Sequence, residues 1–202
     1  MMAQSNKNPD EILINIKEHL KNAVKDRHHG FHAPVFSNID KKNEITSRIV
    51  VLRNFDPHKY ILRFHTDIRS KKIENIANKT LTYFVFYDYK IKVQLRIKTN
   101  SLIHYNDNIA LTAWNKTKLS SRKCYLSKKA PSSNTNLPED GIADSLTGID
   151  PDKEESELGF KNFAVISNKI KSIDWLYLSS LGHKRLRIEI NEKKTKYQWL
   201  IP

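Results

Sequence analysis

The 202-residue chain is long enough for one domain with appendages, and its hydrophobic content of 39% allows a packed core. No apolar run is long enough to span a membrane, and the N-terminal residues lack the apolar segment of a secretory signal. The single cysteine, Cys124, excludes an internal disulfide framework, so we expect a cytoplasmic protein.

The formal net charge of +13 admits three classes of partner: nucleic acid, an anionic membrane surface or a phosphorylated small molecule. A protein that reads nucleic acid concentrates its charge in a recognisable module. The chain has no zinc-finger spacing, no basic-zipper heptads and no aromatic RNA-recognition motif. Charge alone therefore does not favour nucleic acid, and we expect no membrane partner.

Hydrophobic periodicity predicts helices and strands in alternation. In the N-terminal half we expect a helix at residues 9–26 and two strands within residues 31–55, joined by a polar turn at 40–43. We then expect a strand at 60–66, a short helix capped by Ser70 at 70–78, and two more strands at 81–88 and 92–105. In the C-terminal half we expect a helix and three strands, at residues 106–117, 163–179, 184–190 and 196–201.

These seven or eight strands with few helices predict a small antiparallel barrel with helices attached. We interpret residues 1–202 as a single domain that includes an N-terminal helix within 1–30. Residues 130–158 are rich in Pro, Ser, Asn, Asp and Gly, and acidic where the rest of the chain is basic. We interpret them as a long loop insertion.

The junction at residues 64–72 offers a candidate phosphate site. A strand ends there and a helix begins near Ser70, and a helix N-terminus presents free N–H groups. The hydroxyls of Thr66 and Ser70 and the ammonium groups of Lys71 and Lys72 complete a cradle for a phosphate dianion. The same residues also fit a capped surface helix with solvated lysines, and the absence of a Gly-rich loop argues against a nucleoside triphosphate.

Two further side chains are candidates for contact with a ligand. Arg48 lies in the apolar run "RIVVLR", where an arginine is costly unless it meets an anion or extends to water at a sheet edge. Gln94 lies on the polar face of its strand, where it could bind a planar heterocycle or solvent. His28, His29 and His32 cluster, but no carboxylate or thiol joins them in a metal-binding pattern, so we expect a polar loop and no metal site.

Taken together, several segments resemble the pyridoxamine 5'-phosphate oxidase family of FMN-binding split barrels. The family's Arg-Ile-Val-Leu-Leu-Lys-like strand corresponds to "RIVVLR" at 48–53, and its aromatic-Thr-Asn turn to "HTD" at 65–67. Its Ser-Arg-Lys helix start corresponds to "SKK" at 70–72, and the spacing to a later glutamine reaches Gln94. A His-Asp-Arg-Phe-like element near the C-terminus corresponds to "HKRL" at 183–186.

The resemblance implies a mainly β (α+β) fold, a six- to eight-stranded antiparallel split β-barrel with flanking helices, which binds FMN at the interface of a homodimer. It assigns twelve residues to the cofactor: Arg48, Ile49, Val50, Val51, Leu52, His65, Thr66, Ser70, Lys71, Lys72, Gln94 and Arg185. Arg48 and Lys72 would contact the phosphate, and Gln94 would reach the flavin from the partner subunit. On the substrate side it implies His183 and Arg53 as catalytic residues.

Departures from the family pattern concern the substrate. Thr112 and Lys116 stand where the family has a substrate-phosphate tyrosine and arginine, and Leu176 stands in place of a cofactor tryptophan. The arginine that precedes the family's substrate histidine is missing around Ser180 and Leu181. These departures argue against pyridoxamine phosphate and leave an FMN-dependent oxidoreductase acting on an unidentified small molecule. The alternatives are a flavin carrier or sensor without turnover, and a basic nucleic-acid-binding protein.

Overall fold

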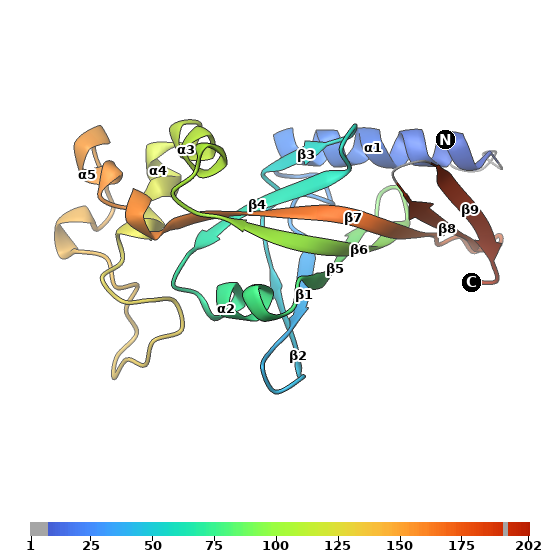
Figure 1. Ribbon diagram of the computed structural model, residues 1–202. Coiled ribbons are helices and arrows are strands. Elements are labelled where there is room, and N and C mark those ends of the chain that lie inside the picture. The colour runs from blue at the N-terminus through green and yellow to red at the C-terminus, as the bar shows by residue number, and fades with distance from the viewer. Residues whose placement is uncertain (1–7, 192–193) are drawn as a thin grey trace.

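The computed structural model describes residues 8–191 and 194–202, in which the chain forms one nine-stranded sheet, five α-helices and three short 3₁₀ helices (Figure 1). The α-helices are α1 (Pro9–Lys25), α2 (Lys71–Asn78), α3 (Asn108–Asn115), α4 (Leu119–Arg122) and α5 (Lys153–Glu157). The 3₁₀ helices are η1 (Lys123–Leu126), η2 (Asp144–Leu146) and η3 (Phe160–Asn162). The strands are β1 (Val35–Ile39), β2 (Ile45–Ile49), β3 (Asn54–Asp56), β4 (Ile61–Asp67), β5 (Leu81–Asp88), β6 (Val93–His104), β7 (Phe163–Tyr177), β8 (Lys184–Ile190) and β9 (Thr195–Leu200).

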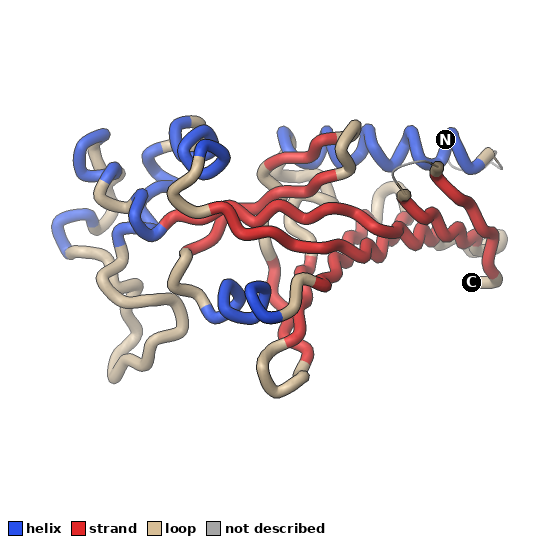
Figure 2. The backbone as a smooth tube through the Cα atoms, viewed as in Figure 1, coloured by secondary structure: helices blue, strands red, loops and turns tan. Residues whose placement is uncertain are grey.

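The sheet is antiparallel, in the order β2-β1-β5-β6-β7-β4-β3, and β8 and β9 extend it from β7. Strand β7 is shared: residues 163–169 pair with β4, and residues 172–177 pair with β8. Its neighbour β6 pairs with β7 along its whole length, with a register shift at Lys98 and Thr99 where the second partner of β7 changes. The long β6–β7 pair runs through the molecule, and the sheet divides around it into a split β-barrel (Figure 2).

The core lies inside the barrel and under α1. Phe36, Phe64 and Phe84 are fully buried, and the ring centroids of Phe36 lie 4.9 Å from Phe64 and 5.1 Å from Phe84. One face of α1 adds Ile12, Leu13, Ile16, Leu20 and Ala23 to this core. Because burial of each large aliphatic side chain contributes roughly 1.5–3 kcal/mol, α1 is held to the barrel by this apolar face.

A smaller apolar cluster lies where α3, α4 and α5 gather around the start of β7, at the end of the molecule opposite the β8–β9 hairpin (Figure 1). Trp114 is fully buried there against Tyr125 and Phe163. Its indole N–H donates to Glu157 over 2.8 Å, which ties α3 to α5. The loop at 130–158 is therefore anchored at its C-terminal end.

The predicted helices and strands are confirmed in type and order, with three corrections. Helices α4 and α5 and the three 3₁₀ helices were not predicted, and α5 and η2 lie within residues 130–158, which were interpreted as a long loop. The run predicted as one strand up to residue 55 ends at Ile49, and a separate short strand, β3, follows at Asn54. This break raises the number of strands to nine in the described residues, against the six to eight predicted. Ser70 occupies the N-cap position of α2, but its hydroxyl donates to the Asp67 carbonyl at 2.7 Å instead of capping the helix.

Candidate functional site

Four side chains from three elements meet at the start of α2. The ammonium group of Lys72 donates to the Thr66 hydroxyl at 3.0 Å, and that hydroxyl lies 3.3 Å from the Ser70 hydroxyl. On the neighbouring β2, the guanidinium group of Arg48 donates to the side-chain oxygens of Asn38 and Thr46 and lies 5.8 Å from the centroid of the Phe36 ring. The sequence-predicted phosphate residues are thus brought together, except Lys71, whose side chain is exposed.

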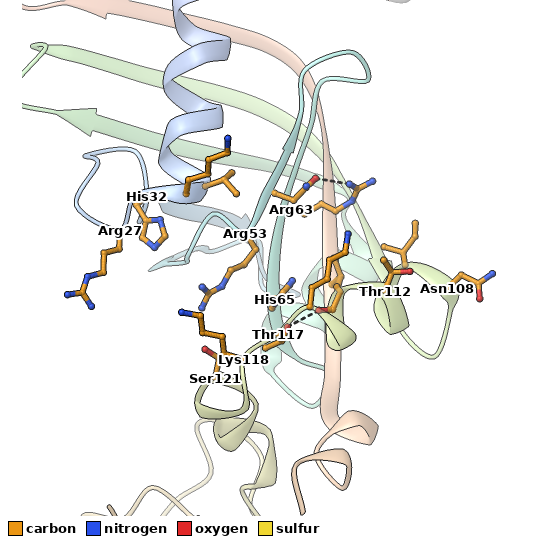
Figure 3. Close-up of a pocket in the computed structure, with 17 residues that line it drawn as sticks. Arg27, His32, Arg53, Arg63, His65, Asn108, Thr112, Thr117, Lys118 and Ser121 are labelled. Atoms are coloured by element: carbon orange, nitrogen blue, oxygen red, sulfur yellow. Dashed lines mark hydrogen bonds between the residues drawn. The ribbon is translucent and has the colours of Figure 1, made fainter. Parts of the chain in front are cut away.

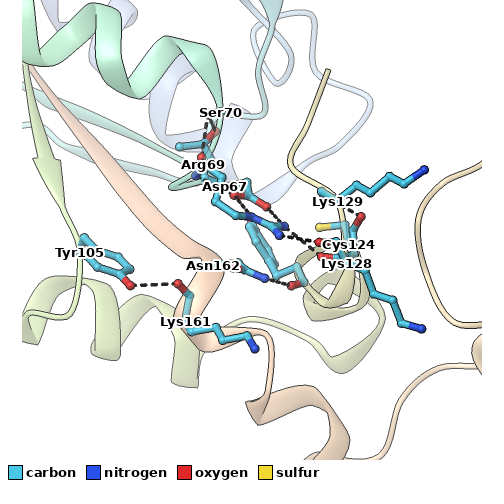
Figure 4. Close-up of polar contacts among 12 residues, drawn as sticks. Asp67, Arg69, Ser70, Tyr105, Cys124, Lys128, Lys129, Lys161 and Asn162 are labelled. Atoms are coloured by element: carbon cyan, nitrogen blue, oxygen red, sulfur yellow. Dashed lines mark hydrogen bonds and ion pairs between the residues drawn. The ribbon is translucent and has the colours of Figure 1, made fainter. Parts of the chain in front are cut away.

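Neither cation of this cluster forms a salt bridge with a carboxylate of the described residues, although the charge of Asp67 acts to raise the pKa of Lys72. Burial and then the nearby charge of Arg48 lower the pKa of Lys72, and burial lowers the pKa of Arg48. The neighbouring Asp67 is engaged by Arg69, whose guanidinium group lies 2.6 Å from the carboxylate and also donates to the Ser127 carbonyl (Figure 4). Two half-buried cations, two hydroxyls and the uncapped first turn of α2 form a donor set that suits a phosphate dianion.

The backbone between β2 and β3 runs alongside the segment before β1. The N–H of Val50 donates to the Pro34 carbonyl at 3.0 Å, and the N–H of Leu52 donates to the His32 carbonyl at 2.8 Å. Val50 and Leu52 are buried, Val51 is half-buried and Ile49 is 69% exposed. Because the strand is interrupted between Ile49 and Asn54, the alternation of side chains in a continuous strand does not force Arg48 and Arg53 onto opposite faces of the sheet.

Gln94 and Arg185 lie together on the outer face of the sheet. Gln94 is opposite Leu176 across the β6–β7 pair, and Leu176 is opposite Arg185 across the β7–β8 pair. Arg185 donates two hydrogen bonds of 3.0 Å to Asp174, and these bonds raise its pKa. His183 lies exposed in the adjoining β7–β8 turn, where its Nδ1 accepts from the Ser179 N–H at 3.0 Å.

The predicted site residues therefore form two groups in one chain. Arg48 pairs with the buried Phe36, so it lies on the core side of the sheet, whereas Gln94 pairs with the exposed Tyr87 on the outer side. Arg53 lies near Val165 at the start of β7, and His183 follows the end of that strand. Twelve residues of strand separate these ends by on the order of 40 Å, so one chain does not bring Arg53 and His183 together.

Arg53 and His65 line a pocket of about 920 Å³ between the end of α1, strands β3 and β4, and helices α3 and α4 (Figure 3). Burial and then the charge of Arg53 lower the pKa of His65 to about 4, so its imidazole is neutral at neutral pH. Its ring packs edge-on against Phe163 at 4.8 Å and, in the part of the chain that the structure describes, makes no hydrogen bond.

Sequence reasoning missed most of the basic residues of this pocket. Besides Arg53 and Lys116 they are Lys25, Arg27, Arg63 and Lys118. Lysine and arginine are spread along the whole sequence, so only the fold distinguishes these four from solvated charges. No residue of the loop at 130–158 lines the pocket.

The histidine cluster is part of the packing around α1. His29 accepts from the Phe31 N–H at 3.0 Å, and its other ring nitrogen lies 3.3 Å from His19 Nδ1. His32 Nδ1 lies 2.6 Å from the Ala23 carbonyl in the last turns of α1. Within residues 8–191 and 194–202, no three metal-binding side chains are grouped to hold a metal ion, and no helix is long and apolar enough to cross a membrane.

Residues 14–105 match the family model of the pyridoxamine 5'-phosphate oxidase FMN-binding domain, and no curated protein matches the chain. A pyridoxamine 5'-phosphate oxidase-related, FMN-binding protein of Nostoc punctiforme is similar in structure, with a TM-score of 0.75 and 17% identity over 98% of this chain and 100% of that one. PhzG of Burkholderia lata, solved with tetrahydrophenazine-1-carboxylic acid, has a TM-score of 0.73 and 14% identity over 100% of this chain and 98% of its own.

A general stress protein 26-related protein of Clostridium acetobutylicum is more distant, with a TM-score of 0.54 and 8% identity over 96% of this chain and 97% of that one. At these identities the structures establish the fold, while the family model extends the likeness to the sequence of the first half of the barrel. The resemblance read from the sequence is therefore confirmed: the chain has the split β-barrel fold of the pyridoxamine 5'-phosphate oxidase-like proteins, and its residues 14–105 match the family model of their FMN-binding domain.

Proposed function

We propose that the protein is an FMN-dependent oxidoreductase acting on a small molecule other than pyridoxamine phosphate. The observation that carries this proposal is the cluster of Arg48, Thr66, Ser70 and Lys72. Its two cations repel one another and are partly desolvated, an arrangement that a bound phosphate dianion would stabilise. The donor set therefore fits the phosphate of FMN.

The two groups of site residues support a homodimer with FMN at its interface. The core-side group offers the phosphate donors, and the outer-face group of Gln94, His183 and Arg185 faces away from them. One flavin can meet both groups only if a second copy of the chain supplies the outer face. Beside Gln94 that face carries exposed apolar side chains, which a partner would cover: Ile49, Val35, Val85, Tyr83 and Tyr87.

When bound, FMN supplies hydride transfer chemistry. The chain's own residues position the cofactor and the substrate. The pair of Arg48 and Lys72 would hold the phosphate, and Gln94 would hydrogen-bond the ring. Arg53 presents a fixed positive charge to the pocket, and His183, whose Nδ1 accepts a backbone N–H, can hold a proton at Nε2 for exchange with substrate.

The test is the visible spectrum of the purified protein, followed by titration of the flavin-free protein with FMN. We expect flavin absorption bands, saturable quenching of FMN fluorescence and bleaching of the bands by a reduced nicotinamide or amine donor. Bound FMN that no donor reduces would instead identify a carrier or sensor. A colourless protein that leaves FMN fluorescence unchanged and binds duplex DNA with a steep salt dependence would contradict the proposal.

A further inference from the structure

The 920 Å³ pocket has three walls, and each contributes two cations (Figure 3). The end of α1 and the residue after it provide Lys25 and Arg27. The region of β3 and β4 provides Arg53 and Arg63, and the region of α3 and α4 provides Lys116 and Lys118. No aspartate or glutamate of the described residues lines the pocket, although the chain has 22 acidic residues.

Within the part of the chain that the structure describes, these six charges have no direct carboxylate partner. None of them forms a salt bridge with another described residue. Carboxylates in the adjoining segments accept hydrogen bonds from backbone N–H groups: Asp26 from His28, Asp56 from His58 and Lys59, and Asp107 from the first turn of α3. Of these, Asp56 also feels the charge of Arg63, which contributes to lowering the pKa of Asp56. The pocket therefore keeps a positive potential that an anionic ligand would neutralise.

Hydrogen bonds within the protein hold the walls of this pocket in place. The ring of His32 contacts the Ala23 carbonyl, and the His32 carbonyl accepts from the Leu52 N–H. These two contacts place the end of α1 beside the pocket. The guanidinium group of Arg63 donates to the hydroxyl of Ser167 and to the amide oxygen of Asn54, each at 2.9 Å. Because both partners are neutral, these hydrogen bonds position Arg63 without neutralising its positive charge.

We propose that this pocket has a second anion subsite at Lys25 and Arg27, so that it binds a small molecule with at least two anionic groups, phosphate or carboxylate; the first group would lie against Arg53 and Lys116, where the resemblance already implies the substrate side of the site. A single phosphate can meet two or three cations at hydrogen-bond distance, which would leave the opposite wall uncompensated. The cavity volume lies within the range of small-molecule sites, and its concave shape does not suit a duplex. Only the description of this ligand as a substrate rests on the proposed function.

The test is calorimetric titration of the full-length, FMN-saturated protein with inorganic phosphate and with tripolyphosphate, at one fixed ionic strength. Saturation with FMN keeps the probes out of the Arg48 and Lys72 cluster. We expect tripolyphosphate to bind at least about tenfold more tightly than phosphate, since it can reach charges on two walls. Equal affinities for the two probes would overturn the proposal.

Two charge-matched variants separate the pocket from general surface charge. The Lys25→Gln/Arg27→Gln double variant should weaken tripolyphosphate binding about tenfold and change phosphate binding less than about twofold. The control, Lys21→Gln/Lys42→Gln, removes two exposed lysines outside the pocket and should change neither. Equal losses in the two variants would refute a second anion subsite at α1. Duplex DNA that displaces tripolyphosphate from the wild type would identify the pocket as a nucleic-acid contact instead.

The outcome is distinguishable from that of the proposed function. If the protein binds FMN but tripolyphosphate binds no better than phosphate, the anion inference fails and the flavin assignment stands. If the flavin-free protein does not bind FMN while tripolyphosphate binding depends on Lys25 and Arg27, the pocket assignment stands and the flavin assignment fails. Thermal unfolding of each variant confirms that it is folded.

Discussion

His65 shows how one buried side chain links the site to stability. It alternates with the core residues of β4, so its ring faces the pocket, where burial and Arg53 keep it neutral. A histidine whose folded pKa is lowered from 6.5 to about 4 binds fewer protons in the folded state. Its contribution to stability is fully present above pH 6.5 and is lost as the pH falls from 6.5 towards 4.

We therefore expect acidification from pH 7 to pH 4.5 to destabilise the wild type more than His65→Leu, by about 2–3 kcal/mol. Urea unfolding of both proteins at the two pH values measures this difference. Parallel losses of stability in wild type and variant would show that His65 titrates normally.

Arg48 is the residue whose removal tests the phosphate cluster most directly. Arg48→Ala should weaken FMN binding by about 1.5–3 kcal/mol, the range of a hydrogen bond to a charged group. Lys42→Ala, which removes an exposed lysine from the nearby β1–β2 turn, should leave the FMN dissociation constant unchanged. Fluorescence titration compares the three proteins, and an unchanged affinity in Arg48→Ala would remove Arg48 from the site.

At the scale of elements, Arg122 holds the helical end of the molecule together. Its side chain is buried, donates to the carbonyls of Trp114 and Thr117, and bonds Ser156 and Glu157 of α5. The helices that it joins, α3 and α4, form one wall of the pocket. Arg122 thus connects α5, at the C-terminal end of the acidic loop, to the wall of the pocket formed by α3 and α4.

Arg122→Ala should lower the free energy of unfolding by about 2–4 kcal/mol, because it removes the Arg122 donor from the Thr117 carbonyl and breaks the bonds that join this buried side chain to Ser156 and Glu157 of α5. Lys153→Ala, which removes an exposed cation from α5, should change it by less than about 0.5 kcal/mol. Chemical denaturation gives both values. A loss in Arg122→Ala no larger than in Lys153→Ala would mean that α4 and α5 are held by apolar packing alone.

For the whole molecule, the outer face of the sheet is the surface where the proposed second copy would complete the site. Ile49, Val35 and Val85 lie in one line across β2, β1 and β5, and all three are exposed. A row of exposed apolar side chains on a sheet face is typical of an interaction surface. In the proposed homodimer this row is covered by the second copy.

Val85→Lys should raise the dimer dissociation constant by at least about tenfold, because it buries an unpaired charge, and should weaken FMN binding in parallel. Leu158→Lys places the same charge on an exposed leucine at the end of α5 and should leave the dimer intact. Sedimentation velocity across a concentration series measures both. A wild-type protein that stays monomeric with saturating FMN would contradict the shared site.

The sequence by itself determined the order and type of the elements, because α1, β4, β5 and β6 carry periodicities that only a helix or a half-buried strand can satisfy. It also determined that Thr66, Ser70 and Lys72, three members of the proposed phosphate cluster, lie together, since they are close in sequence and a strand-to-helix turn must bring them together. Tertiary structure alone decided the break before β3, where backbone pairing with residues 32–34 overrides a continuous apolar run. It alone decided the pocket, because Lys25, Arg63 and Lys118 are far apart in sequence and meet only where three elements pack.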